Sequence, residues 1–140
     1  MKSVQYHNVA ASTRRRMQAV RRKDTAPELS VRRILYAMGY RYRLHRKDLP
    51  GVPDIALGKA KRIIFIHGCF WHGHPECRRA KLPANNFETW RMKIDRNRAR
   101  DSRNIDALHL LGWHVLVLWE CELIDEPSIR ARLATFLAAA

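Results

Sequence analysis

The chain has few acidic residues and no long apolar run. Its 140 residues include 13 Asp and Glu against 27 Lys and Arg, which gives a net charge of +14 at pH 7. No segment approaches the roughly 18–20 apolar residues that span a bilayer, and residues 1–16 contain no apolar core of the kind found in secretory signals. We therefore expect a cytoplasmic protein that does not enter membranes and that attracts polyanions, with nucleic acid as the first candidate.

Cysteine is scarce as well, and the chain contains neither repeats nor low-complexity linkers. The three cysteines are an odd number, and without an export signal they favour metal ligands or free thiols over disulfides. The length suits one domain that is large enough to bury a core. We expect a flexible N-terminal arm at residues 1–12, followed by a single domain at residues 13–140.

Capping residues mark where two of the helices begin. Thr25 or Asp24 can cap a helix that has Pro27 in its first turn. Asn85 and Glu88 form a capping-box pattern at the start of a longer helix. In each case a glycine follows the last apolar residue of the pattern and ends the helix. The predicted helices cover residues 13–20, about 25–38, about 87–111 and 127–137.

Alternating or continuous apolar runs predict strands at residues 40–45, 52–57, 61–66 and 113–119. The first strand alternates and has one face in water, whereas the last is the most apolar and is therefore predicted to be central. A short turn joins the second and third strands into an antiparallel hairpin. This order of helices and strands predicts an α/β fold with a mixed sheet flanked by helices.

Residues 67–77 are the most informative segment, because they hold three histidines, two cysteines and two adjacent aromatic residues. Cysteine and histidine at this density indicate metal ligands. Three thiols and one imidazole would make a closed, structural zinc site, and the alternative is that the cysteines are simply buried and reduced. His72 is also available to zinc, but a closed site of this kind needs only one histidine. The predicted ligands are Cys69, His74, Cys77 and, after the fourth strand, Cys121.

Asp54 lies at the start of the second strand. Taken alone it is typical of a turn aspartate. The antiparallel hairpin, however, brings it to the far end of the third strand, near the backbone carbonyl of Ile66 and the side chain of His67. Few protein oxygens together with substrate phosphates are the usual ligands of Mg²⁺ in phosphodiester hydrolysis. We predict that Asp54 and the Ile66 carbonyl hold a magnesium ion.

His72 and Asp101 are a second candidate pair. A histidine oriented by a carboxylate is a common general base that activates water, whereas the alternative for Asp101 is a solvated salt bridge on a helix. Three aromatic residues, Phe70, Trp71 and Trp90, either stack on a flat partner such as a base pair or pack in the core.

Together these motifs resemble the very-short-patch repair endonucleases of bacteria, and the resemblance covers nearly the whole chain. The matching segments are Thr-Arg-Arg-Arg-Met at 13–17, Lys-Asp-Thr-Ala-Pro-Glu at 23–28, Leu-Pro-Gly-Val-Pro-Asp at 49–54, Phe-Ile-His-Gly-Cys-Phe-Trp-His at 65–72, Asn-Arg-Ala-Arg-Asp at 97–101 and Gly-Trp-His-Val-Leu-Val-Leu-Trp-Glu-Cys at 112–121.

The resemblance implies a restriction-endonuclease-like fold with a structural zinc. It implies Mg²⁺-dependent nicking of DNA on the 5′ side of the thymine in T:G mismatches that arise when 5-methylcytosine deaminates. Asp54 would ligate magnesium and His72, with Asp101, would activate the attacking water. His67 and Glu28 would complete the active site.

The resemblance also implies how DNA is held. Phe70, Trp71 and Trp90 would wedge into the duplex beside the mismatch, while the basic arm with Arg14, Arg15, Arg16 and Met17 would lie on the minor-groove side. The expected partner is double-stranded DNA in the nucleoid, with a repair protein or a methyltransferase as further partners and a monomer as the working form. The alternatives are a homing or restriction-type nuclease with the same core, and a non-catalytic, zinc-stabilised DNA-binding module.

Overall fold

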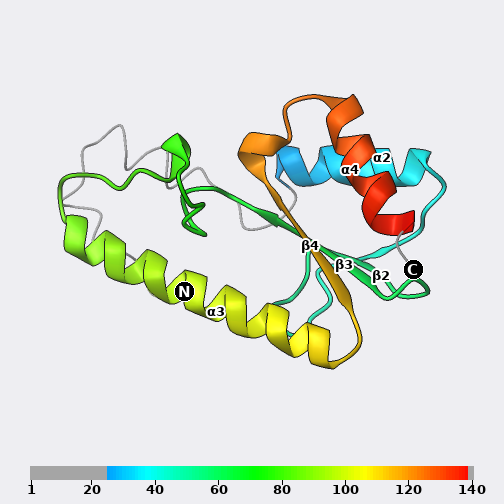
Figure 1. The fold of residues 1–140 in the computed structure, drawn as a ribbon, viewed down its shortest axis with the longest axis horizontal. Helices are drawn as coiled ribbons and strands as arrows, with labels where there is room; N and C mark the ends of the chain where they lie inside the picture. Colours follow the sequence, from blue (N-terminus) through cyan, green and yellow to red (C-terminus); the bar gives the residue numbers. More distant parts are fainter. Residues whose placement is uncertain (1–24, 139–140) are drawn as a thin grey trace.

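The computed structural model describes residues 25–138, which form a four-stranded sheet between two layers of helices (Figure 1). The strands are β1 (Arg43–Leu44), β2 (Ile55–Leu57), β3 (Arg62–His67) and β4 (His114–Trp119), in the spatial order β1-β2-β3-β4. Strand β2 is antiparallel to both β1 and β3, whereas β4 runs parallel to β3. The predicted mixed sheet flanked by helices is confirmed.

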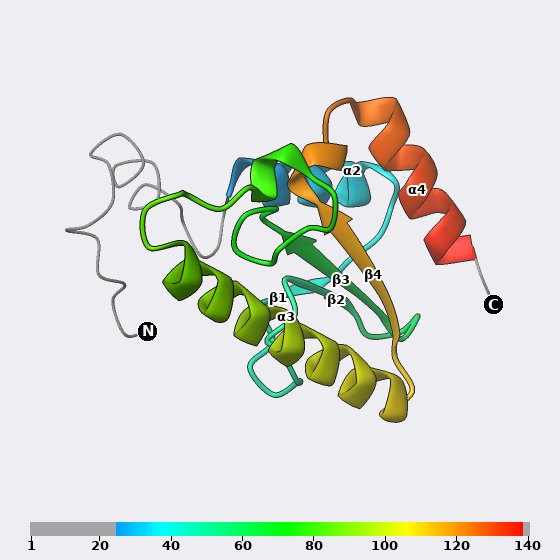
Figure 2. The same ribbon diagram turned by 60° about the vertical axis from the view of Figure 1, so that its left-hand side comes forward.

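The sheet separates two apolar cores. Helices α2 (Ala26–Ala37) and α4 (Glu126–Ala138) cover one face, and the long helix α3 (Phe87–Leu110) crosses the other (Figure 2). Alternate residues of β3 face opposite sides of the sheet: Ile64 packs in the core with α2 and α4, whereas Ile63 and Phe65 pack towards Leu108 of α3. The fold thus follows from the period of two along a strand that is covered on both faces.

The start of α2 is as the sequence predicts. Thr25 is the N-cap, and its hydroxyl accepts a hydrogen bond from the Glu28 amide at 3.3 Å. Pro27 lies in the first turn, where it has no interior hydrogen bond to break. Gly39, with φ +95°, follows the C-cap and takes a conformation that other residues rarely adopt. This cap fixes Glu28 at the buried end of the helix.

The predicted capping box of the long helix is wrong. The N-cap of α3 is Asn86, which has a left-handed backbone (φ 59°) and makes no side-chain capping hydrogen bond. Glu88 instead pairs with Arg91 at 2.8 Å, one turn along the helix. The buried residues of α3 include Trp90, Ile94 and Leu108. Packing of this apolar side therefore holds α3 in place without the capping interaction that its sequence suggests.

The prediction that the last strand is central is also wrong, because β4 is an edge strand of the described sheet. Its apolar residues are needed on both faces: Val115 and Val117 pack towards α3, and Leu116 and Leu118 towards α2 and α4. Coverage of both faces, and not a central position, thus explains the continuous apolar run.

The first strand is limited to β1, although Tyr40 and Tyr42 before it pack against the α2–α4 core. Two short 3-10 helices lie beside the cysteines: η2 (Arg78–Ala80) directly follows Cys77, and η3 (Glu120–Glu122) contains Cys121. The expected arm at 1–12 and helix at 13–20, with Arg14, Arg15, Arg16 and Met17, lie outside the described residues. Within residues 25–138, no helix is long and apolar enough to cross a bilayer.

Candidate active site and metal centre

The site forms where the parallel strands β3 and β4 end side by side. His67 is the last residue of β3 and is paired with Trp119, the last residue of β4. The loop of residues 68–77 continues from β3, and η3 continues from β4, so both start at the same edge of the sheet (Figure 2). This parallel register brings together residues that are about fifty positions apart in the sequence, such as Cys69 and Cys121.

The four predicted zinc ligands are gathered at this edge. Ligand atoms of Cys69, His74, Cys77 and Cys121 all lie within 4.8 Å of one another. The Sγ atom of Cys121 is 3.4 Å from Nδ1 of His74, and the His74 amide donates to the Cys69 carbonyl at 2.9 Å, which closes the loop. Three sulfur donors and one imidazole nitrogen at this spacing fit a tetrahedral zinc ion.

Neighbouring residues fix the orientation of this cluster. The Cys69 amide donates to Oε1 of Glu120 at 3.2 Å, and the His74 ring stacks on Trp119 with centroids 4.1 Å apart. Burial raises the pKa of the Cys69 thiol to about 12. A bound cation would offset this by stabilising the thiolate, so the donor set favours occupation by a metal.

Asp54 occupies the position that the hairpin predicts. Its Oδ2 accepts a hydrogen bond of 2.8 Å from the Ile66 amide, which confirms that β2 and β3 bring these two residues together. Burial raises the pKa of Asp54 to about 6; the Ile66 amide opposes this shift and the Glu28 carboxylate adds to it. Two carboxylates that repel each other in a poorly hydrated place fit a divalent cation.

His45 belongs to the same cluster and was missed by the sequence analysis. Ligand atoms of Glu28, His45 and Asp54 lie within 4.8 Å of one another, and Nε2 of His45 is 2.8 Å from Oε2 of Glu28. Glu28, only 2% exposed, also forms an ion pair with Arg32. The sequence held a signal for His45, because pairing of the first two predicted strands places the residue after Leu44 opposite Asp54.

A pair of histidines and a carboxylate form the third cluster. Nδ1 of His72 lies 2.6 Å from Oδ2 of Asp101, so α3 and the 68–77 loop meet in the predicted pair. The His67 ring stacks on His72 with centroids 3.8 Å apart and planes 4° from parallel. These three residues line a cavity of about 400 Å³ beside the sheet edge.

His67 is a neutral imidazole in this arrangement. Burial, and secondarily the neighbouring His72, lower the pKa of His67 to about 3. Its buried Nδ1 has no hydrogen-bond partner among the described residues. His72 also lowers the pKa of Asp54, although burial is the larger influence on that carboxyl. The two clusters are linked along β3, because Asp54 accepts from the Ile66 amide and His67 is the next residue.

The predicted aromatic set is brought together, but its members differ in exposure. Trp90 is fully buried, and the partly buried Phe70 and Trp71 pack their rings against it at centroid distances of 5.5 and 6.0 Å. Nδ2 of Asn97 donates to the Trp71 carbonyl at 2.9 Å, which ties the loop to α3. Trp90 is thus a core residue in this conformation, and the two loop residues form the outer part of the cluster.

Known proteins resemble this chain over most of its length. A family model described as DNA mismatch endonuclease Vsr matches residues 7–79. The type II nicking enzyme V.XorIIP of Xanthomonas oryzae is 52% identical, over 86% of this chain and 88% of its own. The DNA mismatch endonuclease Vsr of Escherichia coli is 42% identical, over 81% of this chain and 72% of its own.

A solved structure shares the fold. The catalytic domain of the homing endonuclease I-Bth0305I matches with a TM-score of 0.53 and 25% identity, over 81% of this chain and 94% of that domain. The fold is therefore that of a nuclease domain. By the family model and by these degrees of identity, the chain belongs to the Vsr family of DNA mismatch endonucleases.

Proposed function

We propose that this chain nicks double-stranded DNA on the 5′ side of the thymine in a T:G mismatch, by Mg²⁺-dependent hydrolysis of one phosphodiester bond. The observation that carries the proposal is the hydrogen-bonded His72–Asp101 pair, 2.6 Å apart. Its neighbour in the stack, His67, directly follows Ile66, whose amide holds the carboxylate of Asp54. A general base beside a candidate cation site is the arrangement that phosphodiester hydrolysis needs. A protein that only binds DNA gains nothing from carboxylates near phosphates.

His72 would take the proton from the attacking water. If Nδ1–H of His72 donates to Asp101, its Nε2 is left as the acceptor. Asp101 then holds the ring in one orientation and stabilises the imidazolium that forms. The neutral His67, stacked against His72, would offer its unpaired Nδ1 to a water or to an oxygen of the substrate.

Asp54, with the Ile66 carbonyl and Glu28 close by, would hold the magnesium ion. A bound Mg²⁺ would supply Lewis-acid stabilisation of the charge that develops on the phosphate. Asp54 is kept in place by the Ile66 amide. Glu28 is kept in place by His45 and Arg32. These contacts orient the carboxylates before DNA arrives.

Phe70 and Trp71 would insert beside the mismatch. A mismatched pair is less costly to unstack than a matched one, so a wedge at that step gives selectivity. Trp90, buried behind them, would support the two outer rings and would reach DNA only if they moved apart. Met17 and Arg14, Arg15 and Arg16 remain predicted contacts on the minor-groove side.

A zinc ion on Cys69, His74, Cys77 and Cys121 would be structural, because the four donors leave no open position for substrate. It would fasten the 68–77 loop to η3. The loop carries both His72 and the outer aromatic residues, so the zinc would set their positions relative to the sheet edge.

The test is a nicking assay with Mg²⁺ on two duplexes that differ only by T:G or C:G at one position, with the flanking sequence varied as a library. We expect a single nick 5′ to the mispaired thymine and none in the C:G duplex. Loss of the nick when Mg²⁺ is replaced by a non-catalytic cation would support the metal assignment. A nick at another position, or none in any context, would contradict the proposal.

A site-specific nuclease is the second candidate, and two observations favour it. The fold matches a homing endonuclease domain, and several relatives are named as type II nicking enzymes. Equal cutting of the two duplexes at a fixed sequence would support this alternative over mismatch repair.

A further inference from the structure

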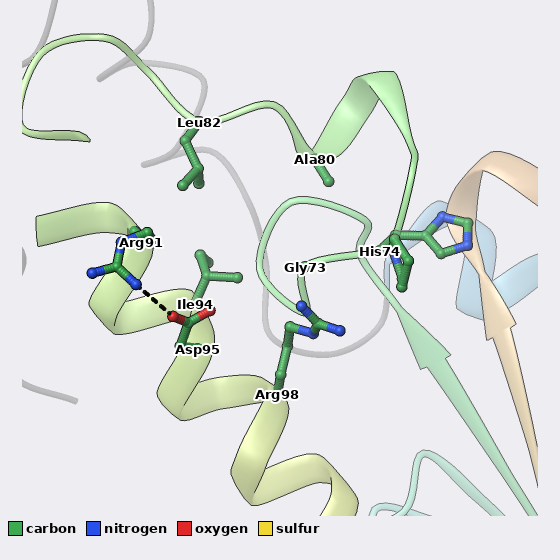
Figure 3. Close-up of a pocket in the computed structure, with 9 residues that line it drawn as sticks. Gly73, His74, Ala80, Leu82, Arg91, Ile94, Asp95 and Arg98 are labelled. Carbon is green, nitrogen blue, oxygen red and sulfur yellow. Dashed lines mark hydrogen bonds and ion pairs between the residues drawn. The ribbon is translucent and has the colours of Figure 1, made fainter. Parts of the chain in front are cut away.

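Arg98 projects from α3 between two hollows next to the candidate active site. Ile94, Arg98, Asp101 and Ile105 recur at spacings of three and four and so share one side of the helix. The smaller hollow, of about 200 Å³, lies under the 73–82 loop, and the larger, of about 400 Å³, is lined by His67, His72 and Asp101; Arg98 lines both. Figure 3 shows its side chain rising from α3 towards the loop at Gly73.

Arg98 has no hydrogen-bonded or charged partner within the described part of the protein. Arg91, two turns earlier on the same side of α3, is held by Glu88 at 2.8 Å and by Asp95 at 3.2 Å. Asp101 is committed to His72. Arg98 makes no hydrogen bond or ion pair with any residue in 25–138, although Asp95 and Asp101, three residues to either side, line the same hollows. Its guanidinium is therefore available to an anion that enters the larger cavity.

Gly73 leaves room for the aliphatic part of the Arg98 side chain because it has no side chain of its own. A Cβ atom at Gly73 would lie 2.7 Å from Cδ of Arg98 and 2.6 Å from Cγ2 of Ile94, so only glycine allows the loop to pack this closely on α3. Gly73 also has a left-handed backbone, with φ +60°. The loop thus packs on the aliphatic part of the side chain, while the residue as a whole remains exposed.

We propose that Arg98 binds a non-bridging oxygen of the phosphodiester at, or directly next to, the bond that is cut. This inference rests on the proposed function and deepens it. It gives the phosphate a cationic side-chain ligand in addition to the proposed magnesium ion and the His72–Asp101 pair. A guanidinium suits a phosphate because its N–H groups can donate to two oxygens at once. A preorganised cation stabilises the negative charge of the reacting phosphate more strongly in the transition state than before water attacks.

The first test compares Arg98→Ala and Arg98→Lys with Arg100→Ala under single-turnover conditions. Arg100 is two residues away, about 200° around the helix, and it lines neither hollow. It therefore matches Arg98 in charge and element but not in position. With enzyme in excess over a T:G duplex, we expect Arg98→Ala to slow nicking on the order of 10- to 100-fold, Arg98→Lys to recover part of this, and Arg100→Ala to change the rate by less than about 3-fold.

The second test locates the phosphate. In a series of duplexes, one phosphate of the cut strand is replaced at a time by a neutral methylphosphonate. We expect one position, at or beside the nick, where the substitution slows the wild type as much as Arg98→Ala does, and where Arg98→Ala then has little further effect. Additive losses at every position, or equal losses for Arg98→Ala and Arg100→Ala, would overturn the proposal.

Binding of the same duplexes, with Ca²⁺ in place of Mg²⁺, separates this proposal from the proposed function. One outcome is that the wild type does not bind T:G DNA more tightly than C:G DNA, yet Arg98→Ala binds as tightly as the wild type to the duplex with one particular methylphosphonate. Mismatch specificity would then be wrong, while the phosphate contact would be supported. If binding losses are additive at all positions, the contact fails whatever DNA is cut. Zinc content measured for each variant checks that the 68–77 loop remains folded.

Discussion

At the scale of single residues, the candidate site contains a carboxylate that the fold holds in unfavourable surroundings. This residue is Asp54, since burial and the nearby Glu28 both disfavour its charged form. Residues of this kind destabilise the protein until a ligand arrives, and they recur at functional sites. The chemistry of their side chains made Asp54, His72 and Asp101 candidates in the sequence, and the structure places His72 against Asp101 and Asp54 against Ile66. His45 was not a candidate, because it has no motif of its own and acquires its place from strand pairing.

Replacing Asp54 by Asn is expected to stabilise the protein in magnesium-free buffer. The pKa of Asp54 is raised from 3.8 to about 6 on folding, so its stabilising contribution is present at low pH and is lost as the pH rises through about 6. At pH 7.5 the variant should gain on the order of 1–3 kcal/mol in urea unfolding, and the gap should shrink by about half at pH 5.

Asp48→Asn is the control for this prediction. Asp48 is exposed, and hydrogen bonding to Arg46 lowers its pKa, so this substitution should not stabilise. Adding Mg²⁺ should raise the stability of the wild type and leave Asp54→Asn nearly unchanged, because the variant lacks the proposed ligand. If Asp54→Asn is less stable than the wild type at pH 7.5 without Mg²⁺, the folded protein does not disfavour the charged form of Asp54.

At the scale of helices and strands, the sequence correctly predicted the features that depend on residues close together in the chain. The cap of α2 and the β2–β3 hairpin depend on residues a few positions apart, and both were predicted from the sequence. The place of β4 in the sheet and the start of α3 depend on contacts between distant segments. An apolar run looks the same in a central strand and in an edge strand covered on both faces, so the sequence could not separate them.

The two predicted helix caps can be compared directly. Thr25→Ala removes the hydroxyl that accepts from the Glu28 amide, and we expect a loss of about 1 kcal/mol in the free energy of unfolding. Asn85→Ala should change the stability by less than about 0.5 kcal/mol, because α3 starts without a side-chain cap. Equal losses at the two positions would mean that the capping box of the sequence does form in solution.

At the scale of the whole molecule, one sheet edge organises the protein. The parallel pair β3–β4 brings the loop with Cys69 and His72 next to η3 with Cys121, while β2 brings Asp54 and α2 brings Glu28 to the same end. The gathering of Cys69, His74, Cys77 and Cys121 was predictable because the three cysteines are few and chemically distinctive. Their link to the candidate active site was not, since it comes from the order of the strands.

Cys121→Ser is expected to lose zinc and stability together. Serine is a poor zinc ligand, and the three remaining donors would leave a binding site that is open and weak. We expect about one zinc per chain in the wild type by elemental analysis, little in the variant, and a lower melting temperature that added zinc does not restore. Full zinc content in Cys121→Ser would show that another residue completes the site.

The most direct test of the account is the single-turnover nicking rate of His72→Ala on a T:G duplex with Mg²⁺, measured beside the wild type and beside His109→Ala, an exposed histidine near the end of α3. If His72 is the general base, its loss should slow nicking at least about 100-fold, whereas DNA binding and the rate of His109→Ala should stay near wild type. Nicking by His72→Ala at close to the wild-type rate would contradict the assignment of the His72–Asp101 pair as the catalytic centre.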